Sequence, residues 1–100
     1  MNPLDSHIND IRQLCSVHHV KHLFAFGSVL GNQLHADSDI DLVVDFDAMD
    51  PGSYTDNYFS LKFSLQQLLG RPVDLLEEKA LRNPFFRSNL NRQKKLIYGY

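Results

Sequence analysis

The first apolar residues of the chain recur at helical spacing. They lie three or four positions apart, which places them on one face of a helix that we expect to run from about residue 5 to residue 17. Asp5 belongs to the residue types that favour a helix N-cap, and we expect it to cap this helix. The apolar face consists of Ile8, Ile11, Leu14 and Cys15.

Two apolar runs then predict β-strands at residues 20–26 and 39–46. A third strand is predicted at residues 72–76, directly after Gly70, which we expect to end a helix. Because a helix lies between the second and third strands, we expect these two strands to be parallel. The first strand brings its end to the same edge of the sheet only if it runs antiparallel to the second.

A longer amphipathic pattern separates the second and third strands. We expect a loop over residues 47–54, with Pro51-Gly52 inside it, and then a helix that begins at Thr55 or Asp56 and ends at Leu69. The apolar stripe of this helix comprises Tyr58, Leu61, Leu65 and Leu68, widened by Phe59, Phe63 and Leu69.

The C-terminal part is predicted to be helical. We expect a short helix at residues 80–82 and a final helix over residues 84–98, while Glu77 and Glu78 have the character of surface charges. The pattern as a whole predicts an α/β fold, with a small mixed sheet of three core strands flanked by helices.

Composition limits the class of protein. The chain has 100 residues, 43% of them hydrophobic and 22% charged, which is typical of one globular domain spanning residues 1–100. No apolar run approaches the roughly 18 residues that a membrane span needs, and the first residues do not have a signal-peptide pattern. The single cysteine, Cys15, suits a reducing compartment, so we expect a cytoplasmic protein.

The net charge of −2 conceals an uneven distribution. Residues 1–78 contain all twelve Asp and Glu residues but only four of the ten Lys and Arg residues. Residues 79–100 contain the other six Lys and Arg residues and no acid. This basic segment either forms an interaction surface or packs over the acidic part of its own chain, and the sequence leaves both alternatives open.

Asp39 and Asp41 are the first candidates for chemistry. They lie two residues apart at the start of a predicted strand, so both project from the same face. Two carboxylates about 5 Å apart repel by roughly 3 kcal/mol at an effective dielectric constant of about 20. The chain has no Lys or Arg between Lys21 and Lys62 to offset this repulsion. A divalent cation is the natural alternative.

Gly27 and Ser28, at the end of the first predicted strand, complement the aspartates. A glycine lets the backbone approach a ligand closely, and a serine hydroxyl beside backbone N–H groups binds phosphate oxygens. The same pair also occurs in ordinary turns. Its position, with ten residues between Ser28 and Asp39, is what makes it informative.

This arrangement resembles the signature of the DNA-polymerase-β-like nucleotidyltransferase superfamily. The signature is an apolar strand, Gly-Ser, a loop, and then Asp-apolar-Asp-apolar, here Asp39 to Leu42. In a chain this short, it resembles the minimal nucleotidyltransferases. The family pattern continues with a third acidic residue between apolar neighbours, and Val73-Asp74-Leu75 fits it. The resemblance covers about residues 20–76 and implies the palm-like fold of polymerase β.

The resemblance implies a role for each of these residues. Asp39, Asp41 and Asp74 are the implied catalytic and metal-binding residues of a Mg²⁺ site, which in this family holds two ions. Gly27 and Ser28 are implied to bind the outer phosphates of a nucleoside triphosphate, with ATP as the expected donor. Asp74 orients or deprotonates an acceptor hydroxyl, which takes the nucleoside monophosphate while pyrophosphate leaves.

The loop after Gly-Ser departs from the family pattern. In relatives it often contains an arginine, whereas here its polar candidates before the acidic residues are Asn32, Gln33 and His35. This departure concerns the part of the pattern that is implied to bind the phosphates.

Minimal nucleotidyltransferases are commonly paired with HEPN-domain proteins, so the resemblance implies an antitoxin that adds a nucleotide to a tyrosine of a HEPN toxin. Two alternatives stay open. One is a binding module with the nucleotidyltransferase fold that acts by docking to a partner protein. The other is a transferase acting on a small molecule or a nucleic-acid end, for which the basic segment is the only support in the sequence.

A zinc site is the weaker metal hypothesis. Four candidate ligands within eight residues, all at one helix end, cannot converge on a tetrahedral ion without a second cluster. Surface or boundary histidines are the favoured interpretation of this group, which consists of Cys15, His18, His19 and His22.

Overall fold

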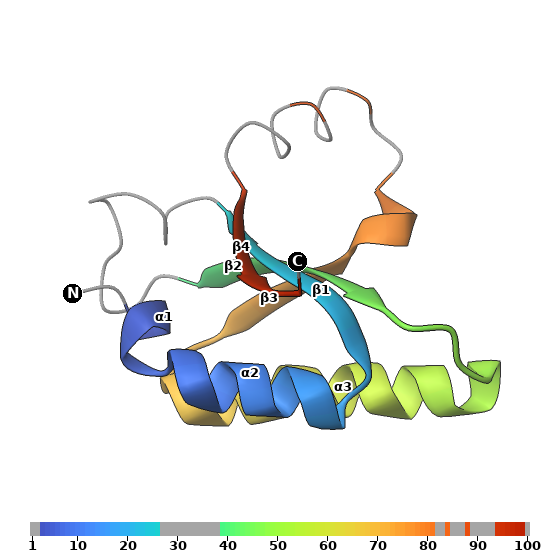
Figure 1. The fold of residues 1–100 in the computed structure, drawn as a ribbon, viewed down its shortest axis with the longest axis horizontal. Helices are drawn as coiled ribbons and strands as arrows, with labels where there is room; N and C mark the ends of the chain where they lie inside the picture. The colour runs from blue at the N-terminus through green and yellow to red at the C-terminus, as the bar shows by residue number, and fades with distance from the viewer. Residues whose placement is uncertain (1–2, 27–38, 82–83, 85–87, 89–93, 100) are drawn as a thin grey trace.

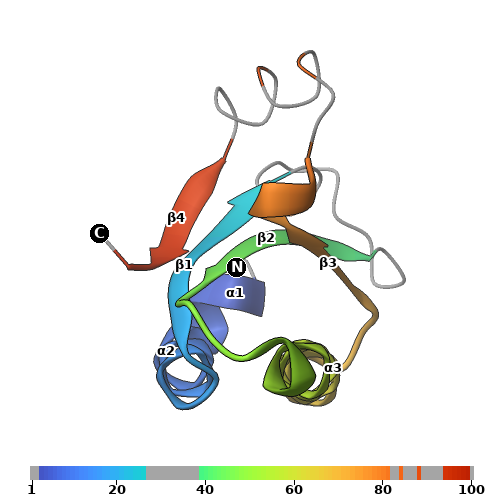
Figure 2. The ribbon, with the colours of Figure 1, turned by 90° about the vertical axis from the view of Figure 1, so that its right-hand side faces the viewer.

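The computed structural model describes residues 3–26, 39–81, 84, 88 and 94–99. In this part of the chain, a mixed sheet lies over two helices, α2 and α3, as Figures 1 and 2 show. None of the described helices combines the length and the apolar character that crossing a membrane requires. The elements, in chain order, are α1 (Pro3–Ser6), α2 (Ile8–Val17), β1 (Val20–Phe26), β2 (Ile40–Phe46), α3 (Pro51–Leu69), β3 (Val73–Glu77), the 3₁₀ helix η2 (Glu78–Ala80) and β4 (Lys95–Tyr98).

The three predicted strands and their directions are confirmed. β1 pairs antiparallel with β2, and β2 pairs parallel with β3. Within the described residues the sheet has four strands in the order β3-β2-β1-β4. The two central strands, β1 and β2, therefore each have a neighbour on both sides, which fixes the position of every side chain along them.

The prediction of a final helix over residues 84–98 is wrong for its last part. Residues 95–98 form β4, an edge strand that pairs antiparallel with β1, with Phe24 opposite Leu96. The predicted sheet of three core strands thus lacks one strand that the structure contains. A four-residue strand offers too little alternation to be recognised, and its partner lies about 70 positions earlier in the chain.

The N-terminal prediction is partly wrong. Asp5 lies inside α1 and does not cap the longer helix, since α2 begins at Ile8 with His7 at its N-cap. The predicted apolar face is nevertheless present, because Ile11 and Cys15 are completely buried. The short helix expected at residues 80–82 is replaced by η2, which lies slightly earlier.

α3 is longer than predicted. It begins at Pro51, inside the expected loop, with Asp50 rather than Thr55 or Asp56 at its N-cap. Proline suits the first position of a helix because its missing N–H has no partner there and its φ is already helical. The C-terminal prediction is confirmed, since Gly70 adopts the left-handed conformation with φ 69° and its N–H bonds to the carbonyl of Gln66.

The apolar stripe of α3 is narrower than expected. Leu61 and Leu65 are completely buried, as predicted, but Phe59 and Phe63 are 45% and 60% exposed and do not belong to the core. Their rings stack on each other on the outer surface of the helix, with centroids 6.0 Å apart. Helical spacing alone does not distinguish a wide core-facing stripe from an exposed aromatic pair.

The core lies between the helices and one face of the sheet. Alternate residues of each strand supply its strand side: Leu23, Ala25, Ile40, Leu42, Val44, Phe46, Val73 and Leu75. The residues between them point to the opposite face, which carries Asp41 and Asp74 and which we call the aspartate face. Figure 2 shows α2 and α3 on one side of the sheet and η2 on the other.

Candidate active site

Strand register brings two of the predicted aspartates together. Ile40 is the Cα partner of Val73, and Asp41 is the Cα partner of Asp74. Ile40 and Val73 are buried against the helices, with 0% and 2% exposure, so the next residue of each strand must project from the other side. Asp41 and Asp74 therefore lie side by side on the aspartate face, one interstrand spacing of about 4.8 Å apart.

Asp39 completes the group from just outside β2. The N–H of Ile40 donates to the carbonyl oxygen of Pro72 at 3.0 Å, which fixes the chain directly after Asp39 at the start of the ladder. Asp39 is exposed and stands two residues before Asp41. The structure thus brings all three predicted aspartates to one end of the sheet, where two parallel strands begin.

Negative charge accumulates at this end of the sheet. The pKa of Asp41 is raised above its ordinary value of 3.8, chiefly because partial burial disfavours the carboxylate and further because the charges of Asp74 and Asp39 repel it. All of these causes act in the same direction. The carboxylate of Asp41 is therefore in an environment that favours uptake of a cation, either a proton or a metal ion.

The donor set fits Mg²⁺. Carboxylate oxygens are the protein ligands that this ion prefers, and it needs only one or two of them beside the oxygens of phosphate groups and water. Among the described residues, no three acidic, histidine or cysteine side chains already converge as a metal-binding group. Repulsion between free carboxylates favours such a spread arrangement.

The predicted phosphate-binding pair, Gly27 and Ser28, lies outside the described residues. The last residue of β1 is Phe26, whose Cα partner in β2 is Asp41. β1 therefore ends at the same end of the sheet at which the aspartates lie, as the antiparallel prediction requires. The role of Gly27 and Ser28 stays a prediction.

Two members of the histidine and cysteine group, Cys15 and His18, are buried at the end of α2. The buried ring of His18 has Nδ1 at 2.8 Å from the carbonyl of Leu14 and Nε2 at 3.0 Å from the Ser60 hydroxyl. Burial raises the pKa of the Cys15 thiol to about 12, which disfavours the thiolate that zinc would bind. His18 thus links α2 to α3.

Two features near the sheet were missed by the sequence interpretation. The ammonium group of Lys94 lies 4.1 Å from the centre of the Phe24 ring, a contact that the predicted C-terminal helix could not have indicated. Glu77, expected to be a surface charge, accepts a hydrogen bond of 2.9 Å from the hydroxyl of Tyr54 and joins β3 to α3. No sequence motif marks either contact.

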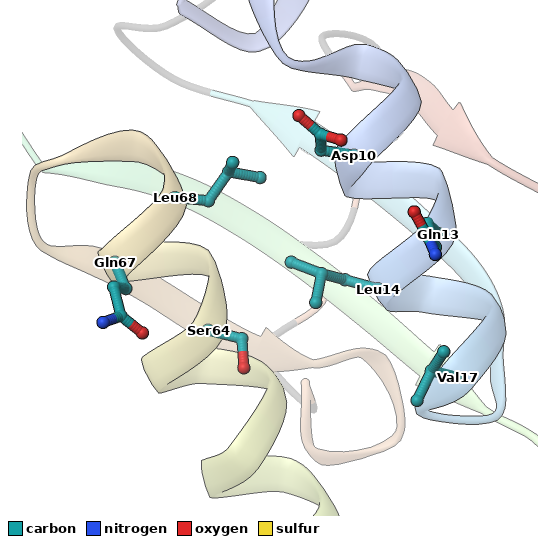
Figure 3. Close-up of a pocket in the computed structure, with 7 residues that line it drawn as sticks. All are labelled: Asp10, Gln13, Leu14, Val17, Ser64, Gln67 and Leu68. Atoms are coloured by element: carbon teal, nitrogen blue, oxygen red, sulfur yellow. The ribbon is translucent and has the colours of Figure 1, made fainter.

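A groove between α2 and α3 lies apart from the aspartates. Its volume is about 460 Å³, and Figure 3 shows side chains of both helices around it. The apolar lining comes from Leu14, Val17 and Leu68, whereas Asp10 and three polar side chains line the rest. Because these helices cover the core side of the sheet, the groove is separated from the aspartate face by the core itself.

Comparison with known proteins identifies the family. Residues 9–100 match the model of the family described as Polymerase beta, Nucleotidyltransferase. The chain belongs to this family. The match spans nearly the whole chain, including β4, so the fourth strand is part of the nucleotidyltransferase and not an addition to it.

Relatives of this nucleotidyltransferase have named activities. Two proteins of Methanocaldococcus jannaschii, both described as candidate protein adenylyltransferases, are 34% and 35% identical to it over 79 residues. In each case the match covers 79% of this chain and 76% of the relative. The family and these relatives together indicate an enzyme that transfers nucleotides.

Solved structures have the same fold. A candidate minimal nucleotidyltransferase is 31% identical, superposes with a TM-score of 0.77, and is matched over 95% of both chains. A toxin–antitoxin complex with AMP-PNP gives a TM-score of 0.73 at 24% identity, over 93% of this chain and 73% of the other. The α/β fold with a mixed sheet and flanking helices is therefore that of the nucleotidyltransferases.

Proposed function

We propose that this nucleotidyltransferase transfers AMP from ATP to a tyrosine hydroxyl of a partner protein, and that the partner is a HEPN toxin for which it serves as the antitoxin. The observation that carries the proposal is the shared end of β2 and β3, where Asp41 and Asp74 are in register and Asp39 stands beside them. Three carboxylates at one sheet end repel one another, and a bound cation would offset this repulsion.

Each aspartate has a distinct task in this proposal. Asp39 and Asp41 would hold Mg²⁺, which would supply positive charge against the phosphates of the donor. Asp74, exposed beside them, accepts the proton of the acceptor hydroxyl. The hydroxyl oxygen then bonds to the α-phosphorus, the bond from that phosphorus to the bridging oxygen breaks, and pyrophosphate leaves with its electron pair.

The choice of acceptor rests on the relatives. The Methanocaldococcus jannaschii proteins are named for transfer of adenylyl groups to protein. A further structural neighbour is a complex of a tri-AMPylated Shewanella oneidensis HEPN toxin with an MNT antitoxin, with a TM-score of 0.67 and 21% identity. These names support a protein acceptor over a small molecule or a nucleic-acid end.

The test is transfer of labelled AMP. The purified chain is incubated with Mg²⁺, α-labelled ATP and a HEPN-domain protein, taken from the adjacent gene where that gene encodes one, and label on this acceptor protein is located by peptide mass spectrometry. We expect label on tyrosine with the wild-type chain and none with Asp39→Asn. Asp47→Asn serves as the matched control, because Asp47 is an exposed aspartate just beyond the far end of β2.

Three results would contradict parts of the proposal. Full activity of Asp39→Asn would exclude the assigned metal role. Label on another side chain would exclude tyrosine as the acceptor. A tight complex with the partner but no transfer of label would favour the binding module instead, which the absence of an arginine from residues 27–38 supports.

A further inference from the structure

We propose that Lys94 binds the outer phosphates of the nucleotide donor and so supplies the positive charge that the loop after β1 lacks. This inference rests on the proposed function, because it needs a triphosphate at the aspartates. It assigns a role to Lys94, which belongs to the basic segment at residues 79–100.

The position of Lys94 follows from the β1–β4 ladder. Phe24 is the Cα partner of Leu96, and Ala25 is the partner of Lys95. Continuing this antiparallel register by one residue places Lys94 opposite Phe26. Since Phe26 is itself the Cα partner of Asp41, Lys94 lies on the same transverse row of the sheet as the central aspartate.

The side chain of Lys94 points to the aspartate face. Its ammonium nitrogen lies 4.1 Å from the centre of the Phe24 ring, and Phe24 alternates with the buried residues Leu23 and Ala25 of β1. An ammonium ion over an aromatic face is attracted by the ring and keeps part of its hydration. The contact therefore holds a positive charge at the sheet surface, and among the described residues it is an aromatic ring rather than a carboxylate that Lys94 contacts.

The separation between Lys94 and the aspartates suits a triphosphate. Two interstrand spacings separate their backbones, about 10 Å in total. Lys94 is thus too far away to neutralise Asp41, whose pKa is shifted by burial and by its negative neighbours. A triphosphate whose inner phosphates contact a cation held by the aspartates, and which extends across β1, would bring its outer phosphates to the Lys94 side chain.

The sequence shows why such a charge is needed here. No Lys or Arg occurs between Lys21 and Lys62, so residues 27–38 contain no lysine or arginine that could contact the phosphates. A triphosphate carries more negative charge than one Mg²⁺ ion neutralises. Lys94, directly before β4, would supply this positive charge beside the end of β1.

The adjacent residue provides a matched control. Lys95 is the Cα partner of the buried Ala25, so its side chain leaves the opposite face of β4. There its ammonium nitrogen lies 3.9 Å from a carboxylate oxygen of Asp5 in α1, and both side chains are about 60% exposed. Two neighbouring lysines of equal charge thus point to opposite faces of one strand.

The test compares nucleotides that differ in the number of phosphates. Calorimetry measures the affinity of the full chain for AMP-PNP with Mg²⁺ and for AMP, in the wild type and in Lys94→Met, Lys94→Arg and Lys95→Met. Methionine keeps an aliphatic side chain on the Phe24 ring, so Lys94→Met removes the charge with little loss of packing. Lys94→Arg keeps both the charge and the ring contact.

We expect Lys94→Met to weaken AMP-PNP binding by about tenfold, the loss typical of one hydrogen bond to a charged group. The affinity for AMP should be unchanged, Lys94→Arg should bind AMP-PNP nearly as the wild type does, and Lys95→Met should have no effect. Wild-type affinity of Lys94→Met for AMP-PNP, or an equal loss of affinity for AMP and AMP-PNP, would overturn this inference but not the proposed function. Failure of the wild type to bind AMP-PNP would overturn the proposed function as well.

Discussion

Replacing Asp74 with asparagine should stabilise the metal-free protein. The substitution keeps the shape of the side chain and removes one of two charges that stand in register on adjacent strands. At about 5 Å, the repulsion between Asp41 and Asp74 is roughly 3 kcal/mol for an effective dielectric constant of 20 and about 1 kcal/mol for that of water. Because Asp74 is exposed, solvent screening places the gain near the lower value, about 1 kcal/mol.

Urea denaturation in the presence of a chelator measures this gain as an increase in the free energy of unfolding. Asp47→Asn is the control for loss of an exposed acidic charge away from the site. A double-mutant cycle with Asp41→Asn isolates the pairwise term, because the benefit of Asp74→Asn should largely disappear once Asp41 is already neutral.

Added Mg²⁺ should reverse the order of stability. The wild type gains free energy of unfolding when it binds the ion, whereas Asp74→Asn gains less because a ligand or neighbouring charge is missing. An Asp74→Asn protein that is no more stable than Asp47→Asn without metal, and that shows no coupling to Asp41, would refute the electrostatic account of this sheet end.

Further predictions concern pH, one hydrogen bond and packing. The raised pKa of Asp41 means that the folded protein binds a proton more readily than the unfolded chain. Without metal, the Asp41 carboxylate therefore destabilises the fold above its raised pKa, and this destabilisation is relieved as the pH falls through the raised pKa toward 3.8. The pH dependence of the free energy of unfolding should differ in this sense between the wild type and Asp41→Asn, and identical profiles would contradict it. Tyr54→Phe removes the 2.9 Å hydrogen bond to Glu77 and should lower the free energy of unfolding by about 1 kcal/mol, measured in urea; an unchanged midpoint would show that water replaces the bond. Leu65→Ala, at a completely buried position, should cost about 2–5 kcal/mol. Phe63→Ser, at a position 60% exposed, should stay within about 0.5 kcal/mol in the same assay, and equal losses would contradict the assigned burial.

The aspartate site could be predicted from sequence because strand periodicity determines it locally. Asp39 and Asp41 share a face whenever their segment is extended, and a helix between two strands imposes the parallel pairing that brings Asp74 alongside. Neither step needs information about distant parts of the chain. The burial of Ile40 and Val73 places both aspartates on the opposite face, and the β2–β3 pairing sets Asp41 opposite Asp74.

The errors arise where a local pattern has two physical meanings. Pro51 ends many helices but also begins them, and here it occupies the first position of α3. Phe59 and Phe63 have the spacing of core residues, yet the helix is turned so that they face outward. Which meaning applies depends on the orientation of α3 against the sheet, and helical spacing does not give that orientation.

β4 was missed for a different reason. Leu96 to Tyr98 form a continuous apolar run without alternation, so the run is compatible with helix or strand. The hydrogen bonds that decide between them come from β1, far away in the sequence. The position of Lys94 was missed for the same reason, because only the pairing of β4 with β1 relates Lys94 to the aspartates.

The pairing of Phe26 with Asp41 also has a consequence for how this enzyme could diversify. The chain leaves β1 at Phe26 and enters the neighbouring strand β2 at Ile40, so a change in the number of residues between these two points mainly alters the entropy of closing the connection, which changes slowly with length. Family members could therefore differ in the length of this connection at little cost to the buried residues of β1 and β2.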